Sequence, residues 1–255
     1  MPGHWLLAKM GKRVLRPGGR ELTNWMLRQL QVHPKDDVVE FAPGLGETAR
    51  LVLAQQPRSY TAIERDGDAM RSVQKLLNGT HQRCFLGSAE ETGLADQSAT
   101  VVLGEAMLSM QPGPAKTRIV AEAARVLSVG GRYAIHELSL TPDGDDRSVG
   151  DAIMRELSDE IHVGVRPLTV QEWRELLTGA GFTVVSQNVA PMHLLEPIRL
   201  IRDEGFAGAI RFVWNVACNA EARRRVRTMR AIFRKYRQHL AAVSLVAVKR
   251  GHGTT

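Results

Sequence analysis

The chain has few cysteines and no pattern of residues that suits a metal ion. Its 255 residues include two cysteines, Cys84 and Cys218, which lie far apart and outside any C-x-x-C spacing. Two such cysteines exclude a disulfide-rich scaffold, and the eight histidines are scattered rather than set at ligand spacing. We therefore expect two buried thiols and no metal site.

Long apolar runs are also missing. No stretch approaches the roughly 18–20 apolar residues that a membrane span needs. The opening residues, Met-Pro-Gly-His-Trp-Leu-Leu-Ala-Lys, contain an apolar stretch too short for a signal peptide. We expect a cytoplasmic protein with no membrane partner.

Acidic residues are outnumbered, 27 to 34, which gives a net charge of +7. The basic residues gather near the N-terminus and, above all, in residues 223–237. Charge in this arrangement is more often the solvated face of an amphipathic helix than a surface that reads nucleic acid. Nucleic acid is an unfavoured partner that the charge leaves open.

The most informative stretch is residues 37–49. A short apolar run comes directly before a Gly44-Leu45-Gly46 turn, and a helix is predicted to start at Glu47. Bare backbone at the two glycines lets a ligand approach closely. The spacing satisfies the loose dinucleotide pattern G-x-G-x-x-G/A, yet Glu40 would repel a pyrophosphate and attract a sulfonium or ammonium group.

These residues resemble a known motif. Glu40-Phe41-Ala42-Pro43-Gly44-Leu45-Gly46 is similar to motif I of the class I S-adenosylmethionine-dependent methyltransferases, an acid followed by G-x-G-x-G, with Ala42 at the first glycine. The chain most resembles the type 11-like, small-molecule branch. The resemblance implies S-adenosylmethionine as cofactor and S-adenosylhomocysteine as product.

Further segments follow in the order that the family shows. By resemblance, Glu64 at the end of the second strand binds the ribose and Arg65 lies against the adenine. Ser88-Ala89-Glu90 stands where the family often has Asp-Ala, so Ser88, Glu90 or water would take the adenine amino group. The predicted cofactor-binding residues are Glu40, Ala42, Pro43, Gly44, Gly46, Glu64, Arg65, Ser88, Ala89, Glu90 and Glu105.

Methyl transfer from a sulfonium is an in-line displacement that needs a well-placed acceptor and, for some acceptors, a base. His136, at the end of the fifth predicted strand, is the first candidate base because imidazole titrates near neutral pH. Glu105 is the second catalytic candidate, and His162 is a substitute. A purely structural role for His136 stays open.

The pattern predicts an α/β fold: a doubly wound, mostly parallel seven-stranded sheet with an antiparallel last strand, N-terminal helices, and a helical insertion before the last strand. We predict an N-terminal helical extension (residues 1–34), a cofactor domain (35–190 with 241–250) and a helical substrate cap (191–240). The extension would cover either the site's mouth or a sheet edge. Residues 141–146 are interpreted as a turn or mobile lid.

The sequence thus favours a methyltransferase acting on an O, N or C atom of a small, partly apolar molecule. Four methionines predicted near the mouth suit such a ligand, although core packing also explains them: Met107, Met110, Met154 and Met192. One alternative is an RNA- or protein-directed methyltransferase that uses the basic insertion. A less favoured alternative is an NAD-dependent oxidoreductase. The sequence does not specify the acceptor or the oligomeric state.

Overall fold

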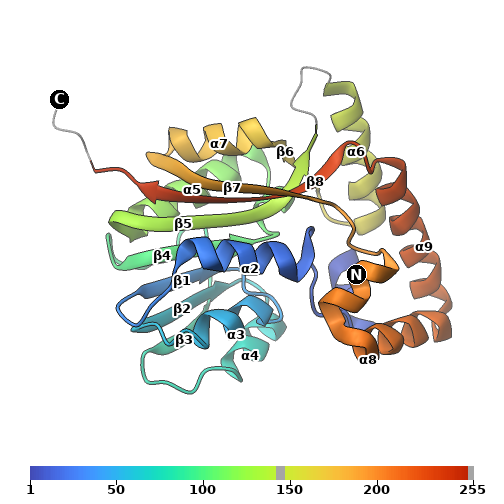
Figure 1. Ribbon diagram of the computed structural model, residues 1–255, viewed down its shortest axis with the longest axis horizontal. Coiled ribbons are helices and arrows are strands. Elements are labelled where there is room, and N and C mark those ends of the chain that lie inside the picture. The colour runs from blue at the N-terminus through green and yellow to red at the C-terminus, as the bar shows by residue number, and fades with distance from the viewer. Residues whose placement is uncertain (142–146, 252–255) are drawn as a thin grey trace.

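The computed structural model describes residues 1–141 and 147–251. A twisted sheet carries helices on both faces, and a group of helices lies beyond one end of the strands (Figure 1). The turn or lid predicted at residues 141–146 falls, except for its first residue, outside the described residues.

One sheet contains all strands of the described residues, in the order β3-β2-β1-β4-β5-β8-β7, with short β6 beside β5. The last strand, β8, runs antiparallel to both of its neighbours, whereas β1 to β5 pair in parallel. The predicted fold class is confirmed, with β6 as a two-residue addition. The strands are β1 (Asp37–Phe41), β2 (Ser59–Glu64), β3 (Gln82–Leu86), β4 (Ala99–Glu105), β5 (Leu127–Leu140), β6 (Leu168–Thr169), β7 (Phe182–Pro191) and β8 (Leu240–Lys249).

The sheet is buried on both faces. Neighbouring β5 residues alternate, with Tyr133 and Ile135 in one apolar cluster and Ala134 in the other. One face is covered by α2 (Gly19–Leu30), α3 (Glu47–Leu53) and α4 (Gly67–Gln74), and the other by α5 (Gly113–Val126) and α7 (Val170–Gly179). These two layers fix the strand ends at which ligands bind in open α/β sheets.

A third apolar cluster lies beyond the carboxyl ends of the parallel strands (Figure 1). It joins α1 (Gly3–Lys9), α6 (Arg147–Ile161), α8 (Pro197–Cys218) and α9 (Ala220–Lys235). The helical insertion predicted before the last strand is therefore present as α8 and α9, and it packs against the first helix of the chain.

Local sequence signals set several boundaries. Thr169 and Glu172 have the T-x-x-E spacing of a capping box, and they form one at the start of α7. The side chain of Asp66 caps α4 by accepting from the amides of Asp68 and Ala69. Residues 128–131, with two glycines, would suit a turn before a strand; they form instead an irregularity inside the 14-residue strand β5, where Gly130 takes a φ of 77° and the register with β4 shifts.

The two cysteines differ in environment. Cys84 on β3 is buried, as predicted. Cys218 is exposed at the end of α8, so the prediction of a buried thiol is wrong there. The prediction rested on the general tendency of free cysteines to be buried, and the position of Cys218 at the end of a helix departs from it.

Candidate active site

A cavity of about 500 Å³ lies at the carboxyl ends of β1, β2 and β4. All the predicted cofactor-binding residues except Gly46 lie in its wall. The strand ends of a parallel sheet thus bring together segments that are up to 65 positions apart in sequence, from Glu40 to Glu105.

The turn after β1 needs left-handed backbone at three positions. Ala42, at the family's first glycine, has a φ of 51°, and its amide donates to the carbonyl of Ile63 at 2.8 Å. At Gly44 the φ is 56°, and an added Cβ would meet no described atom within 4 Å. Gly46 differs, because its Cβ would stand 2.6 Å from Leu76. The missing side chain of Gly44 therefore keeps space open in the cavity, whereas that of Gly46 lets the turn pack against Val73 and Leu76.

Glu64 holds this turn. Its buried carboxylate accepts hydrogen bonds from the amide of Gly44 at 2.9 Å, of Arg65 at 2.9 Å and of Asp66 at 3.1 Å. A carboxylate offers about four acceptor positions, so one remains for a ligand. The side chain both shapes the turn and faces the cavity.

Glu40 lies deeper, on β1. The hydroxyl of Tyr60 donates to its carboxylate at 2.6 Å. Burial raises the pKa of Glu40 to about 8, against the opposing effect of the Tyr60 hydrogen bond and with a further rise from the negative charge of Glu105. At neutral pH this side chain is mostly the neutral acid, ready to ionise when a cation binds.

Glu105, at the end of β4, is the opposite case. Burial alone would raise its pKa, but the positive charge of Arg16 and the hydrogen bond from His136 outweigh it and lower the pKa to about 2. Thr23 donates to the same carboxylate at 2.7 Å, and the hydroxyl of Thr48 donates to its other oxygen. The carboxylate is ionised and already well supplied with donors.

His136 is fully buried and is not part of the cavity wall. Its Nδ1 lies 2.7 Å from Glu105 and its Nε2 lies 2.5 Å from the carbonyl oxygen of Pro17. Both ring nitrogens are therefore held by polar groups inside the protein, and neither belongs to the cavity wall. This geometry favours a supporting role over the predicted role of base. His162, the substitute, is exposed and also outside the wall.

The wall near β3 carries the residues predicted to meet an adenine. The hydroxyl of Ser88 accepts from the amide of Glu90 at 3.1 Å, which keeps this segment in a tight turn. The carboxylate of Glu90 is paired with Arg118 at 2.6 Å. Ser88 and the backbone of this turn are therefore freer to bind a base edge than the Glu90 side chain.

The sequence did not identify specific residues of the N-terminal segment as part of the site. Six of them line the cavity: Pro2, His4, Trp5, Arg13, Leu15 and Arg16. The ring of His4 lies 5.2 Å from that of Trp5, and its Nδ1 is buried with no hydrogen-bond partner among the described residues. Burial lowers the pKa of His4, and the charge of Arg65 lowers it further. No motif surrounds these residues; Trp5 so near the N-terminus was the one visible signal.

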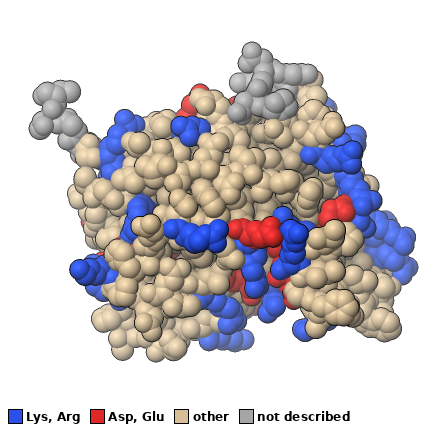
Figure 2. Space-filling model, in the orientation of Figure 1, with Lys and Arg blue, Asp and Glu red and all other residues tan. Residues whose placement is uncertain are grey.

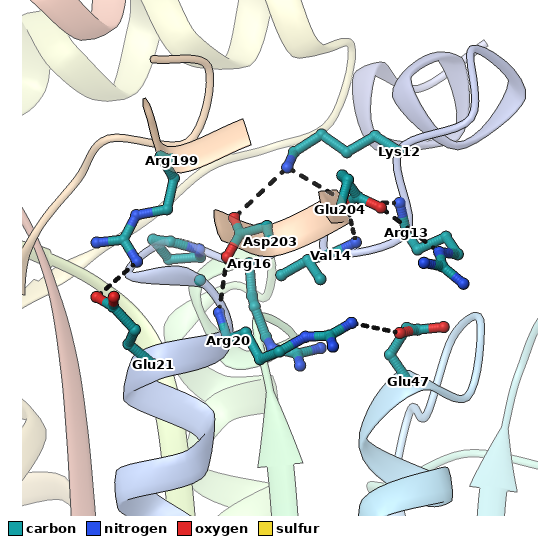
Figure 3. A network of polar contacts seen from close by, with 12 residues as sticks. Lys12, Arg13, Val14, Arg16, Arg20, Glu21, Glu47, Arg199, Asp203 and Glu204 are labelled. Carbon is teal, nitrogen blue, oxygen red and sulfur yellow. Dashed lines mark hydrogen bonds and ion pairs between the residues drawn. The ribbon is translucent and has the colours of Figure 1, made fainter. Parts of the chain in front are cut away.

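Helix α8 holds the N-terminal segment in place (Figure 3). Lys12 is buried 3.6 Å from both Asp203 and Glu204. The carboxylate of Glu204 also accepts from the amides of Arg13 and Val14, each at 2.9 Å.

Asp203 accepts from the amide of Arg20, also at 2.9 Å, and the Arg20 side chain reaches Glu47 on α3 at 3.3 Å (Figure 3). The predicted insertion thus supports the cavity indirectly, through the segment that covers it.

An apolar part of the wall follows β4. Met107 and Met110 line the cavity; Met107 directly precedes the short 3-10 helix η1 (Leu108–Met110), and Met110 is its last residue. The buried carboxylate of Glu137 accepts from the amides of Met107, Leu108 and Ser109 at 2.8–3.0 Å and so fixes this turn. Met154 and Met192, predicted near the mouth, are not part of the wall, and Met192 belongs to the third apolar cluster.

Comparisons with known proteins agree with this arrangement. Residues 39–135 match the model of a methyltransferase domain. A Haemophilus influenzae protein described as uncharacterized is 32% identical over 247 residues, which is 94% of this chain and 96% of that protein.

Solved structures share the fold. A Haemonchus contortus phosphoethanolamine N-methyltransferase, in complex with phosphomonomethylethanolamine and S-adenosylhomocysteine, matches with a TM-score of 0.74 and 11% identity, over 97% of this chain and 57% of that one. A cyclopropane synthase of Mycobacterium tuberculosis matches with a TM-score of 0.70 and 16% identity, over 89% and 82% of the two chains.

The sheet order with its antiparallel last strand, the acid-flanked glycine turn at the strand ends and the matching domain model converge on one family. The chain belongs to the class I S-adenosylmethionine-dependent methyltransferases.

Proposed function

We propose that the enzyme transfers the methyl group of S-adenosylmethionine to a small, partly apolar molecule that binds beneath the N-terminal segment. The observation that carries this proposal is the composition of the cavity wall: one cavity of about 500 Å³ is lined both by acids of β1, β2 and β4 and by Trp5, His4 and Leu15. That volume lies within the roughly 300–1,000 Å³ typical of small-molecule sites.

The residues of the wall suit the cofactor. The free acceptor position of Glu64 would take a ribose hydroxyl, and the turn around Ser88 would receive the adenine edge. Glu40 and Arg16 lie close enough for the charge of Arg16 to lower the pKa of Glu40. An acid beside a cation fits the ammonium and carboxylate of an amino-acid end.

The sulfonium supplies an activated methyl group, so the chain's own task is to hold the acceptor in line and to remove a proton where one is lost. We assign proton removal to His4. Its buried Nδ1 belongs to a residue of the cavity wall, and its lowered pKa keeps the imidazole neutral at pH 7. Glu105 and His136 would then act as positioning residues that hold Arg16 and the carbonyl of Pro17.

Two features of the wall favour a small acceptor over RNA or protein. The N-terminal segment covers the cavity and is tied down by buried ion pairs, and the apolar contacts come from Met107, Met110 and Trp5. The Haemonchus enzyme of the same fold binds a small phosphorylated amine, which supports this size of acceptor without identifying it.

Two experiments test the proposal. Calorimetric titration should show S-adenosylmethionine binding well below millimolar concentration and no binding of NAD⁺. A cell extract treated with methyl-labelled cofactor should then place label in the fraction that passes a small-pore filter. Label confined to precipitated RNA or protein would contradict the small-molecule assignment, and binding of NAD⁺ alone would contradict the cofactor.

A further inference from the structure

The positive charge of this protein is concentrated in one structural unit. Residues 197–235, which form α8 and α9, contain ten basic and three acidic side chains, whereas the remainder of the chain contains 24 of each. Asp203 and Glu204 are buried against the N-terminal segment, so Glu221 is the exposed acid of the unit. Eight of the ten basic side chains are not buried, and basic residues form the blue margin beside α9 (Figure 2).

Several of these arginines have no structural task. Arg211, Arg224 and Arg227 are exposed and form no ion pair within residues 1–141 and 147–251. Arg230 and Arg234, by contrast, pair with Glu196. Like charges without an acidic partner repel one another, and an anionic partner would relieve this repulsion.

An apolar groove lies beside these cations. Gly205 breaks α8 with a φ of 73° and a ψ of 168°, and the two halves of the helix enclose a groove of about 320 Å³. All nine residues of its wall are apolar, and the adjoining surface in Figure 2 is uncharged at the lower right. Phe206 and Trp214 are 71% and 69% exposed. At the far end of the groove, Arg223 donates to the carbonyl of Ala217 at 2.7 Å.

We propose that the outer surface of α8 and α9 binds an anionic lipid bilayer, with Phe206 and Trp214 entering the interface and the unpaired arginines meeting the headgroup phosphates. The presence of exposed apolar and basic side chains on one surface distinguishes between the partners considered. A second copy of the chain would bring the same positive charge against this one. A nucleic acid would satisfy the arginines but leave the apolar groove in water. An anionic bilayer satisfies both.

Such docking differs from crossing a membrane. No helix in the part of the chain that the structure describes is long and apolar enough to span one. The sequence had suggested no membrane partner at all, because neither the kink at Gly205 nor the exposure of the apolar residues is visible in the residue pattern. Asp203 and Glu204 of α8 are buried against the N-terminal segment (Figure 3) and are not part of the groove wall.

The test is flotation of the purified enzyme with vesicles of phosphatidylcholine, alone or mixed with phosphatidylglycerol, at low and high salt. We expect binding to the mixed vesicles only, weakened by salt. Changing Arg224→Gln with Arg227→Gln should weaken binding roughly 30-fold, because each basic residue near an anionic surface contributes about fivefold. Phe206→Ser with Trp214→Ser should weaken it at least roughly tenfold.

Matched controls use surface residues elsewhere in the chain. Arg28→Gln with Arg71→Gln removes the same charge, and Val185→Ser with Val189→Ser removes exposed apolar side chains from β7. Both control pairs should float like the wild type, and an unchanged melting temperature should show that each variant is folded.

Absence of binding to the mixed vesicles overturns the proposal. The proposal is also overturned if the Phe206→Ser and Trp214→Ser variant floats as well as the Val185→Ser and Val189→Ser control. The surface would then bind by charge alone, as one that binds polynucleotides does. If the wild type binds no vesicles but self-associates, and Phe206→Ser with Trp214→Ser abolishes that self-association, the groove is assigned to a second copy of the chain instead.

Discussion

The phenol of Tyr60 donates a 2.6 Å hydrogen bond to the carboxylate of Glu40, across the pairing of β1 with β2. Both side chains are buried, and Glu40 faces the cofactor cavity. With a pKa of about 8, Glu40 is mainly protonated at neutral pH until a cation arrives. We therefore expect the acid before the glycine turn to be neutral in the free enzyme and to ionise when the cofactor binds.

The first prediction concerns the pH dependence of cofactor binding. If the bound cation ionises Glu40, binding releases a proton below pH 8, and affinity rises with pH by up to about tenfold per unit before levelling off above that value. Calorimetry in buffers of different ionisation enthalpy should count close to one proton released at pH 7. Glu40→Gln should bind more weakly and with no such slope; a slope that persists in this variant assigns the proton to another group.

The same side chain affects stability in the opposite sense. Its pKa in the folded chain is raised from 4.5 to about 8, so its contribution is complete below pH 4.5 and is lost as the pH rises through 8. The free energy of unfolding of the ligand-free enzyme should fall over that window by up to a few kcal/mol. Urea titrations at pH 5 and pH 8.5 measure the difference, and Glu40→Gln should flatten it.

A second prediction separates the two glycines of the turn. Gly44→Ala and Gly46→Ala each place a side chain at positive φ, which costs about 1–2 kcal/mol of stability. Only Gly44→Ala adds a methyl group to the open side of the turn, so we expect it to weaken cofactor binding by a much larger factor. Gly46→Ala contacts Leu76, and Leu76→Ala should relieve part of its loss. Equal losses of cofactor affinity in the two variants would contradict the assignment of Gly44 to the cavity side of the turn and of Gly46 to the side that faces Leu76.

His4 is the third subject. Once an acceptor that loses a proton is in hand, His4→Gln should lower kcat roughly 100-fold or more while leaving cofactor affinity unchanged. The wild-type rate should fall as the pH drops through a value below 6.5, and Arg65→Gln should move that fall to higher pH at saturating cofactor. His81→Gln, on an exposed residue, is the control. Full activity of His4→Gln with unaltered pH dependence would show that another group removes the proton.

The fourth prediction addresses the support of the cavity by α8. Glu204→Ala leaves Lys12 and the amides of Arg13 and Val14 without their buried acceptor, so we expect a loss of about 3–5 kcal/mol in the free energy of unfolding. Glu21→Ala removes an exposed acid that pairs with Arg199 and Arg202 and should cost less than about 1 kcal/mol. Urea unfolding distinguishes them; similar costs would show that Glu204 is no anchor.

Much of the fold was readable from the sequence because its signals are local. The apolar run before Gly44, the capping box at Thr169 and the delayed last strand each depend on neighbouring residues, and together they predict the sheet and the insertion. The length of β5 was not predicted, because Gly130 and Gly131 look like a turn that precedes a strand. In the structure they interrupt the pairing without ending the strand: Leu127 pairs with Ala99, and at Arg132 pairing with β4 resumes and pairing with β8 begins.

The residues of the site also differ in how far the sequence could predict them. Glu40, Gly44 and Glu64 follow strands that the sequence predicts, so their shared position at the strand ends was foreseeable. The environment of His136 was not, because it depends on the carbonyl of Pro17, which lies 119 positions away. His4 and Trp5 belong to α1, which packs against α6 and α9. Contacts between segments so far apart in the chain cannot be predicted from the pattern of the neighbouring residues.

The most direct measurement is a crystal structure of the enzyme with S-adenosylhomocysteine. We predict that the nucleoside lies between the Gly44 turn and Ser88, with a ribose hydroxyl within about 3.2 Å of the Glu64 carboxylate and the amino-acid end beside Glu40. A nucleoside bound elsewhere, or a Glu64 side chain turned toward solvent with the product in place, would contradict the account.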